Sequence, residues 1–298
     1  MNGYQSAGSC ERYGDLLALD HLSLNVEEGE VLGLLGPNGS GKTTAINCML
    51  SLLEYDKGSV EIFGKPMAPD AYDIKKDIGV VMQNVAVFDE LTVLENIDYF
   101  CGLYVRDREK RKQLVKEAVS FVGLDDFRRL NIACGIAHKP KLIFFDEPTV
   151  AVDPQSRNNI LEGIQRLNRE GATIVYTSHY MEEIEQICSR IVILDKGAVI
   201  ADGTKEELKD MISLGETITV ESTDIQPEYA EEMRRIPGVV SVENGNGRLV
   251  VKSEKNRNNL ENVLEFLKKH SVAYGRIYTE LPTLNDVFLE LTGKELRD

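Results

Sequence analysis

Three short runs of mainly apolar residues are each followed, directly or after a few residues, by polar residues. The runs span residues 31–35, 142–145 and 172–177. Runs of this length, bounded by glycine or by polar side chains, are typical of parallel strands that are buried on both faces. Because the carboxyl ends of such strands meet at one edge of a sheet, we expect the polar residues after the three runs to lie together.

The first run leads into a glycine-rich loop and then into a helical pattern. The loop fits the pattern G-x-x-x-x-G-K-[ST] in its strand–loop–helix setting, and the segment reads Gly36, Pro37, Asn38, Gly39, Ser40, Gly41, Lys42, Thr43 and Thr44. Glycines let successive N–H groups face inward, and the helix adds positive potential at its N-terminus. We expect Lys42 to reach the β- and γ-phosphates of a nucleotide and the Thr43 hydroxyl to ligate Mg²⁺.

Carboxylates and a histidine follow the other two runs. Asp146 and Glu147 come directly after the second run, and His179 lies at the end of the third. At the end of a buried parallel strand, Asp146 fits a residue that holds Mg²⁺ directly or from the second sphere, and Glu147 a general base that polarises water. Taken singly, an acidic pair here is often a helix N-cap, and a lone histidine is more often a turn residue. Together with the phosphate loop, they indicate a site for a nucleoside triphosphate.

The segment between the phosphate loop and the acidic pair carries helical patterns. Thr92 and Glu95 have the spacing of a capping box, which opens a helix. Further on, apolar residues recur at helical spacing against charged ones, and they are Leu114, Val115, Ala118, Phe121 and Val122. We therefore expect a helical insertion over about residues 84–138, inside an α/β ATP-binding domain of the P-loop NTPase class that spans residues 1–215.

The chain from residue 216 to residue 298 has a different pattern. It reads strand, helix, hairpin, helix and strand, and the hairpin turns on the run from Asn244 to Gly247. This βαββαβ order predicts a small C-terminal α+β domain of the ferredoxin-like type. The segment carries no ligand motif, which favours a role in interaction or dimer support.

Composition narrows the class of protein. The formal net charge of −15 argues against a general nucleic-acid-binding protein, since phosphate backbones favour basic surfaces. The five cysteines are scattered and never form CxxC, which is typical of reduced thiols in a cytosolic protein. No apolar run approaches the ~18 residues that a membrane span requires, and the N-terminus does not read as a signal peptide. We expect any membrane association to come through a partner.

With these motifs, the chain resembles the nucleotide-binding subunits of ABC transporters over nearly its whole length. GPNGSGKTT is similar to the Walker A loop, LIFFDEP to the Walker B strand, VAVD at 150–153 to the D-loop, and Ser178-His179 to the switch histidine. The resemblance implies that Gln83, in GVVMQN, contacts Mg²⁺ and couples the site to a membrane partner. It also implies that Tyr13 stacks on adenine, and that Glu147, His179 and Gln83 act in catalysis.

The C-terminal pattern extends the resemblance to the ATPases of ABC-2 type exporters, the drug- and antibiotic-resistance class. This resemblance implies that ATP and Mg²⁺ are the cofactors, and that an ABC-2 type transmembrane permease subunit and a second nucleotide-binding subunit are the partners. No nucleic-acid partner is expected. The implied location is cytoplasmic, on the inner face of the cell membrane through the permease.

One segment of the family pattern is absent. In the family, a Leu-Ser-Gly-Gly signature directly precedes the helix written here as RRLNIACGIAHKP, and it binds the γ-phosphate of ATP held by the opposite subunit. Here Phe127 joins Arg128 with no Ser-Gly-Gly nearby. Asp125 and Asp126 would repel a triphosphate, and Arg128 lacks the glycines that a phosphate nest needs. We expect ATP·Mg²⁺ binding, and the missing half-site argues against hydrolysis by a symmetric homodimer.

The N-terminus departs from the family pattern as well. MNGYQSAGSCE lacks the apolar strand that normally precedes Tyr13, so we expect no regular strand there and a frayed subdomain on the adenine side.

Three functions remain open at this stage. The first is an energy-coupling exporter subunit, either active in a hybrid pair whose other subunit supplies the signature or a defective copy. The second is a catalytically degenerate regulatory or structural protein that binds nucleotide without turnover. The third is an ABC protein of DNA repair or translation, against which the acidity, the single cassette and the lack of long coiled-coil heptads all weigh.

Overall fold

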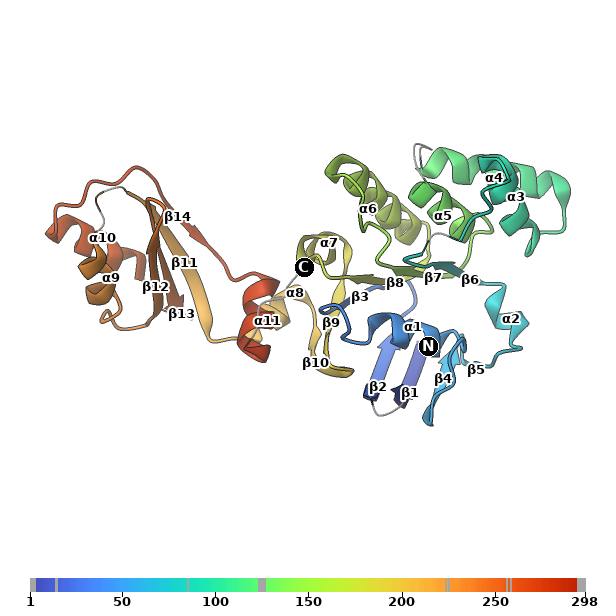
Figure 1. Cartoon of the computed structure of the whole chain (residues 1–298), viewed down its shortest axis with the longest axis horizontal. Coiled ribbons are helices and arrows are strands. Elements are labelled where there is room, and N and C mark those ends of the chain that lie inside the picture. The colour runs from blue at the N-terminus through green and yellow to red at the C-terminus, as the bar shows by residue number, and fades with distance from the viewer. Residues whose placement is uncertain are drawn as a thin grey trace. The chain divides into compact units, whose positions relative to one another are not determined.

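The structure, a computed structural model, describes residues 4–13, 16–84, 86–122, 127–222, 224, 226–255, 257 and 259–293. At residues 4–13, 16–18, 122, 127, 128 and 227 only the backbone is described. The chain divides into two compact units, one up to Lys205 and one from Glu206 (Figure 1). This division precedes the predicted boundary after residue 215. The reason is that Lys255 of the second unit binds the Lys209 carbonyl and the Asp210 carboxylate, which holds the preceding helix to that unit.

The first unit is built around a six-stranded sheet in the order β10-β9-β3-β8-β7-β6. Its strands are β3 (Val31–Leu35), β6 (Ile78–Val81), β7 (Leu142–Asp146), β8 (Thr173–Ser178), β9 (Arg190–Asp195) and β10 (Ala198–Gly203). All neighbours pair in parallel except β10, which runs antiparallel to β9. The predicted α/β class and the three predicted buried strands are confirmed, because β3, β7 and β8 are buried along their whole length.

A four-stranded antiparallel sheet in the order β2-β1-β4-β5 lies beside the first. Its strands are β1 (Tyr4–Tyr13), β2 (Leu16–Val26), β4 (Lys57–Ile62) and β5 (Lys65–Pro66). The prediction that the N-terminal residues form no strand is wrong. Strand β1 pairs with β2 and β4 through backbone groups, and this pairing does not require the apolar alternation that the sequence lacks.

One apolar core joins the two sheets. Side chains of β2, β4 and α1 (Lys42–Met49) pack with those of β3, β7, β8 and β9, so that α1 lies between the sheets (Figure 1). On the other face of the main sheet, α7 (Met181–Ile187) packs against β3 and β8, and α6 (Pro154–Arg169) packs against α7. The short helix α2 (Tyr72–Lys75) precedes β6.

The predicted helical insertion is confirmed between β6 and β7. It contains α3 (Val93–Gly102), α4 (Arg108–Val122) and α5 (Phe127–Ile136), which share a small apolar core of their own. The capping box of Thr92 and Glu95 opens α3 as expected, with both reciprocal hydrogen bonds formed. Helix α5 packs against β6, so the insertion is anchored beside this edge strand of the main sheet.

The second unit is a four-stranded antiparallel sheet in the order β12-β13-β11-β14. Its elements are α8 (Lys205–Met211), β11 (Leu214–Glu221), α9 (Pro227–Met233), β12 (Val239–Gly245), β13 (Arg248–Glu254), α10 (Asn259–Lys269), β14 (Ile277–Glu280) and α11 (Leu284–Thr292). This strand order confirms the ferredoxin-like prediction. The hairpin turns at Asn246 and Gly247, whose φ angles of 53° and 73° fit the expected Asn-Gly turn.

Among the described residues, every helix is too short or too polar to cross a lipid bilayer.

Candidate nucleotide-binding site

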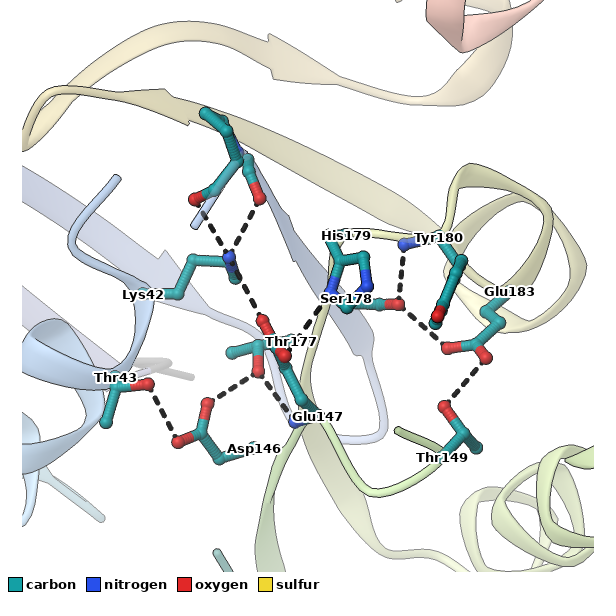
Figure 2. A network of polar contacts seen from close by, with 12 residues as sticks. Lys42, Thr43, Asp146, Glu147, Thr149, Thr177, Ser178, His179, Tyr180 and Glu183 are labelled. Carbon is teal, nitrogen blue, oxygen red and sulfur yellow. Dashed lines mark hydrogen bonds and ion pairs between the residues drawn. The ribbon is translucent and has the colours of Figure 1, made fainter. Parts of the chain in front are cut away.

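The three strand ends predicted to meet do so. Strands β3, β8 and β7 are neighbours in the main sheet, and their carboxyl ends lead into the segments that carry Lys42, His179 and Glu147. Figure 2 shows these side chains converging on one region from three separate segments of the chain. The parallel order of the sheet therefore places a cation, two carboxylates and an imidazole at one edge.

The loop between β3 and α1 has the backbone of a phosphate-binding loop. Gly39 and Gly41 have φ angles of 80° and 103°, a region that side chains other than glycine rarely adopt. Gly36 has no room for a side chain, because a Cβ there would lie 2.4 Å from the Leu194 carbonyl oxygen. Gly41 is the N-cap of α1, and no side chain of the described residues caps this end. Its first-turn N–H groups are thus available to an anion.

Lys42 is buried at the centre of this loop. Its Nζ donates to the carbonyl oxygens of Gly36, at 2.8 Å, and Pro37, at 3.2 Å. It also lies 3.2 Å from Oε1 of Glu147, and both side chains are less than a tenth exposed. A buried ammonium is costly without partners, so the loop carbonyls and Glu147 together stabilise its charge.

Asp146 is fixed by two hydroxyls. Thr43 Oγ1 donates to one carboxylate oxygen at 2.9 Å, and Thr177 Oγ1 donates to the other at 2.7 Å. Burial raises the pKa of the Asp146 carboxyl above its usual range, and the two hydroxyl hydrogen bonds oppose this shift. The contact between Thr43 and Asp146 places a hydroxyl oxygen and a carboxylate oxygen side by side. Mg²⁺ prefers hard oxygen ligands of these kinds.

Glu147 is held in an unfavourable backbone conformation. Its φ angle is 47°, in the left-handed region, and its N–H donates to both the carbonyl and the hydroxyl of Thr177. Such backbone strain costs on the order of 1–3 kcal/mol and is concentrated at functional sites. The strained turn brings Oε2 of Glu147 to 3.3 Å from Nδ1 of His179, which is itself about nine-tenths buried.

These residues fit a magnesium nucleoside triphosphate. Among the described residues, the buried Ser40 hydroxyl has no hydrogen-bond partner, and it lies within the loop that would surround the phosphates. The described residues hold no cluster of three or more His, Cys, Asp or Glu side chains that could bind a metal ion unaided. Proteins usually bind Mg²⁺ through one or two carboxylates together with the phosphates of the nucleotide.

Gln83 and Tyr13 are further predicted site residues. Gln83 is exposed and follows β6, which pairs in parallel with β7, so it lies at the same edge of the sheet as Asp146. Tyr13 is the last residue of β1, but its side chain lies outside the described residues, as do those of Asp125, Asp126 and Arg128. Ala151, in the segment that resembles the D-loop, has a left-handed φ of 60°, and Asp153 caps α6.

The structure also places a buried carboxylate that the sequence analysis missed. Glu183 of α7 accepts hydrogen bonds from Thr149 and Ser178, at 2.7 Å and 2.8 Å (Figure 2). It also accepts one from the Tyr176 hydroxyl at 2.8 Å. In the sequence, Glu183 is one of two adjacent glutamates at the start of a helix, where acidic residues are common. The hydrogen bonds from Tyr176 and Ser178 of β8 to this glutamate are therefore visible only in the three-dimensional structure.

Two family models match the chain. One, described as ABC transporter, matches residues 19–150. The other, described as the C-terminal domain of ATP-binding proteins like DrrA1-3, matches residues 203–292.

Curated relatives match nearly end to end. The chain is 34% identical to the linearmycin resistance ATP-binding protein LnrL of Bacillus subtilis (strain 168), over 96% of this chain and 97% of that protein. It is 32% identical to the daunorubicin resistance ATP-binding protein DrrA3 of Streptomyces coeruleorubidus, with 97% and 96% covered. It is also 32% identical to the Nod factor export ATP-binding protein I of Burkholderia thailandensis (strain ATCC 700388), with 97% and 96% covered.

Solved structures match the larger unit. A dimeric, post-hydrolysis structure of the ATP-binding cassette MJ0796 bound to ADP and Pi is similar with a TM-score of 0.61 and 26% identity, over 67% of this chain and 98% of that one. A structure of an ATP-binding subunit of an ABC transporter is similar with a TM-score of 0.63 over 70% of this chain and 92% of that one. At 22% identity the second likeness concerns the fold alone.

Proposed function

Because this chain belongs to the family of ABC transporter ATP-binding subunits, among relatives of the drug- and antibiotic-resistance type, we propose that it binds ATP·Mg²⁺ and couples this binding to export through a separate ABC-2 type permease. The observation that carries the proposal is the convergence of Lys42, Asp146, Glu147 and His179 at three neighbouring strand ends. Proteins of this family bind ATP, and we propose that this chain binds ATP at Lys42, Asp146 and Glu147.

Each residue has a role in the proposed site. The ammonium of Lys42 would exchange its contact with Glu147 for the β- and γ-phosphates, while the N–H groups of residues 38–44 would surround the same phosphates. Thr43 and Asp146 would hold Mg²⁺, and Gln83, from the loop after β6, would contact the same ion. When bound, Mg²⁺ neutralises the charge that develops on the phosphates.

Glu147 and His179 form the proposed catalytic pair. Released from Lys42, the Glu147 carboxylate orients and polarises the attacking water, and His179 lies within 3.3 Å of its other oxygen. The strained backbone of Glu147 supports this assignment, because the turn aims the carboxylate toward Lys42 and His179.

The helical insertion carries the proposed surface for the permease. Large apolar side chains are exposed on α3 and its flanking loops, near Gln83 in the chain, and these are Phe88, Leu91, Leu94, Tyr99 and Leu103. A group of exposed apolar residues of this kind is typical of a protein–protein interface. Docking there would hold the chain on the inner face of the cell membrane, in the cytoplasm.

A second nucleotide-binding subunit is part of the proposal. The start of α5 lacks the Ser-Gly-Gly segment that the family presents to the opposite nucleotide, so two copies of this chain would each lack half of a site. We therefore propose that turnover requires a partner subunit that carries the missing glycines. The same absence favours the alternative, a nucleotide-binding subunit without turnover of its own.

Nucleotide binding by paired variants tests the site. Lys42→Ala is expected to weaken the binding of a fluorescent ATP analogue with Mg²⁺ by about a hundredfold or more, since the loop loses its one ammonium. Glu147→Gln is expected to retain or tighten binding, because it removes the carboxylate that competes with the phosphates for Lys42. Tight binding by Lys42→Ala would overturn the site assignment. Copurification with a membrane permease subunit tests the transport role separately.

A further inference from the structure

We propose that Glu183 is a positioning residue that holds the two chemical segments of the nucleotide site in register. Through Thr149 it fixes the segment that follows Glu147, and through Ser178 it fixes the loop that carries His179. The inference rests on the proposed nucleotide site. Glu183 acts on that site through Thr149 and Ser178.

The Glu183 carboxylate contacts several segments at once. Its Oε1 accepts from Thr149 Oγ1 at 2.7 Å and lies 3.3 Å from Nε of Arg157, which belongs to α6. Its Oε2 accepts from the Tyr176 hydroxyl and from Ser178 Oγ, both at 2.8 Å. The α7 carboxylate thus links the loop after β7, the end of β8 and the first turns of α6.

Burial makes these contacts energetically important. The Glu183 side chain is 2% exposed, and a buried carboxylate left without donors would carry a large desolvation penalty. The hydroxyl of Tyr176 stays protonated as a donor, because burial and the adjacent Glu183 charge raise its pKa well above the usual range. Three hydroxyls donate hydrogen bonds to the carboxylate, and the nearby Arg157 guanidinium adds a compensating positive charge.

Ser178 passes this restraint to the histidine. Its hydroxyl donates to Glu183 and accepts from the backbone N–H of Tyr180, so it bridges the residue before His179 and the residue after it. The guanidinium of Arg157 lies 4.6 Å from the centre of the Tyr180 ring, and that ring lies 4.1 Å from the imidazole of His179. The imidazole is therefore packed against a loop whose two ends are tied to Glu183 and to its partner Arg157.

Thr149 passes the restraint to the carboxylate side. It lies two residues after Glu147, and its carbonyl accepts from the N–H of Val152 at 3.1 Å. The turn from Glu147 to Val152 contains two residues with left-handed backbone, Glu147 and Ala151, whose φ angles are 47° and 60°. Strained residues persist only where surrounding contacts hold them, and the Glu183–Thr149 hydrogen bond is one such contact.

The neighbouring glutamate provides a matched control. Glu182 and Glu183 both lie in the first turn of α7, so both carboxylates interact with the same helix terminus. Glu182 is exposed, whereas Glu183 is buried among the hydroxyls. Glu182→Gln and Glu183→Gln therefore remove the same charge from the same helix end, and only Glu183→Gln alters the network.

Hydrogen exchange of the full chain, resolved by peptide, tests the proposal without requiring turnover. Glu183→Gln is expected to speed exchange about tenfold in the peptides that contain Val152 and Tyr180, and to leave α1 unchanged. Thr149→Val is expected to affect only the first of these peptides and Ser178→Ala only the second. Glu182→Gln is expected to match the wild type in all of them.

Two results would overturn the positioning role. Unchanged exchange at Val152 and Tyr180 in a folded Glu183→Gln variant would show that the network does not restrain the site. Uniformly faster exchange, with α1 included, would show that Glu183 only supports overall stability. Binding of ATP·Mg²⁺ by the wild type is measured in parallel. Its failure would reject the proposed function, while the exchange pattern would still decide the role of Glu183.

Discussion

The two units of this chain treat buried polar groups in opposite ways. At the strand ends of the first unit, Lys42, Asp146, Glu147 and Glu183 are all nearly inaccessible to solvent. In the second unit, the buried polar side chains of the described residues are neutral, and they are Thr219, Ser222, Ser253 and Asn259. Its ion pairs, such as Lys255 with Asp210, are partly exposed.

The contrast separates chemistry from packing. Buried charges rarely add net stability, because desolvation offsets their attraction, so a cluster of four at one sheet edge calls for a functional reason. The second unit instead has an apolar core formed by one face of its sheet with α9 and α10. We propose that it serves interaction or dimer support, and that the nucleotide chemistry belongs to the first unit alone.

The largest expected effect is a loss of stability in the second unit without a loss of binding. Leu249→Ala, at a fully buried position near the start of β13, is expected to reduce the free energy of unfolding of that unit by about 2–5 kcal/mol, because it opens a cavity. Thermal unfolding measured with and without ATP·Mg²⁺ checks this. The exposed Leu281→Ala is the matched control, with little expected change. A large fall in nucleotide affinity of Leu249→Ala would contradict the separation of roles.

A smaller and pH-dependent effect is expected at Asp146. Because its pKa is raised in the folded state, the folded protein binds the proton more tightly than the unfolded chain does. The contribution of this group to the free energy of unfolding is therefore lost as the pH rises from the pKa of Asp146 in the unfolded chain through its higher pKa in the folded protein. Asp146→Asn removes that loss, so its stability relative to the wild type should increase between pH 4 and pH 8 without nucleotide.

Urea unfolding of both proteins across this range measures the difference. Adding Mg²⁺ and ATP should reverse the order, because Asp146→Asn lacks the carboxylate proposed to hold the metal. If the difference in stability between the wild type and Asp146→Asn does not change with pH, burial does not raise the pKa of Asp146. Equal stabilisation of both proteins by ATP·Mg²⁺ would contradict its role as a ligand.

The smallest expected effect concerns an exposed ion pair of the second unit. Lys255→Met removes the contact with Asp210, which is largely exposed, and should change the free energy of unfolding by less than about 1 kcal/mol. Chemical unfolding of that unit measures the change, and nucleotide affinity should be unaltered. An effect as large as that of Leu249→Ala would mean that charge, not apolar packing, stabilises this unit.

Much of this arrangement follows from sequence, and the exceptions have physical causes. Strands β3, β7 and β8 and the capping box at Thr92 are predictable, since apolar runs and capping depend on neighbouring residues. Strand β1 is not, because its pairing is made by backbone groups that carry no sequence signal.

The candidate site divides in the same way. The glycine loop and the acidic pair carry local motifs, so Lys42 and Asp146 could be identified from sequence. The contact between Lys42 and Glu147 depends on a strained φ angle, and the role of Glu183 depends on contacts with Thr149 and Ser178 from other elements. Neither leaves a pattern in the residues beside it.

Steady-state ATP hydrolysis by the purified chain tests the central claim most directly, with Glu147→Gln as the control and nucleotide binding measured in parallel. The account predicts that the wild type binds ATP·Mg²⁺ but does not turn it over alone, because no Ser-Gly-Gly segment precedes α5 to complete the opposite site. Turnover by the chain alone that is abolished by Glu147→Gln would contradict the account, since another group would then complete the site.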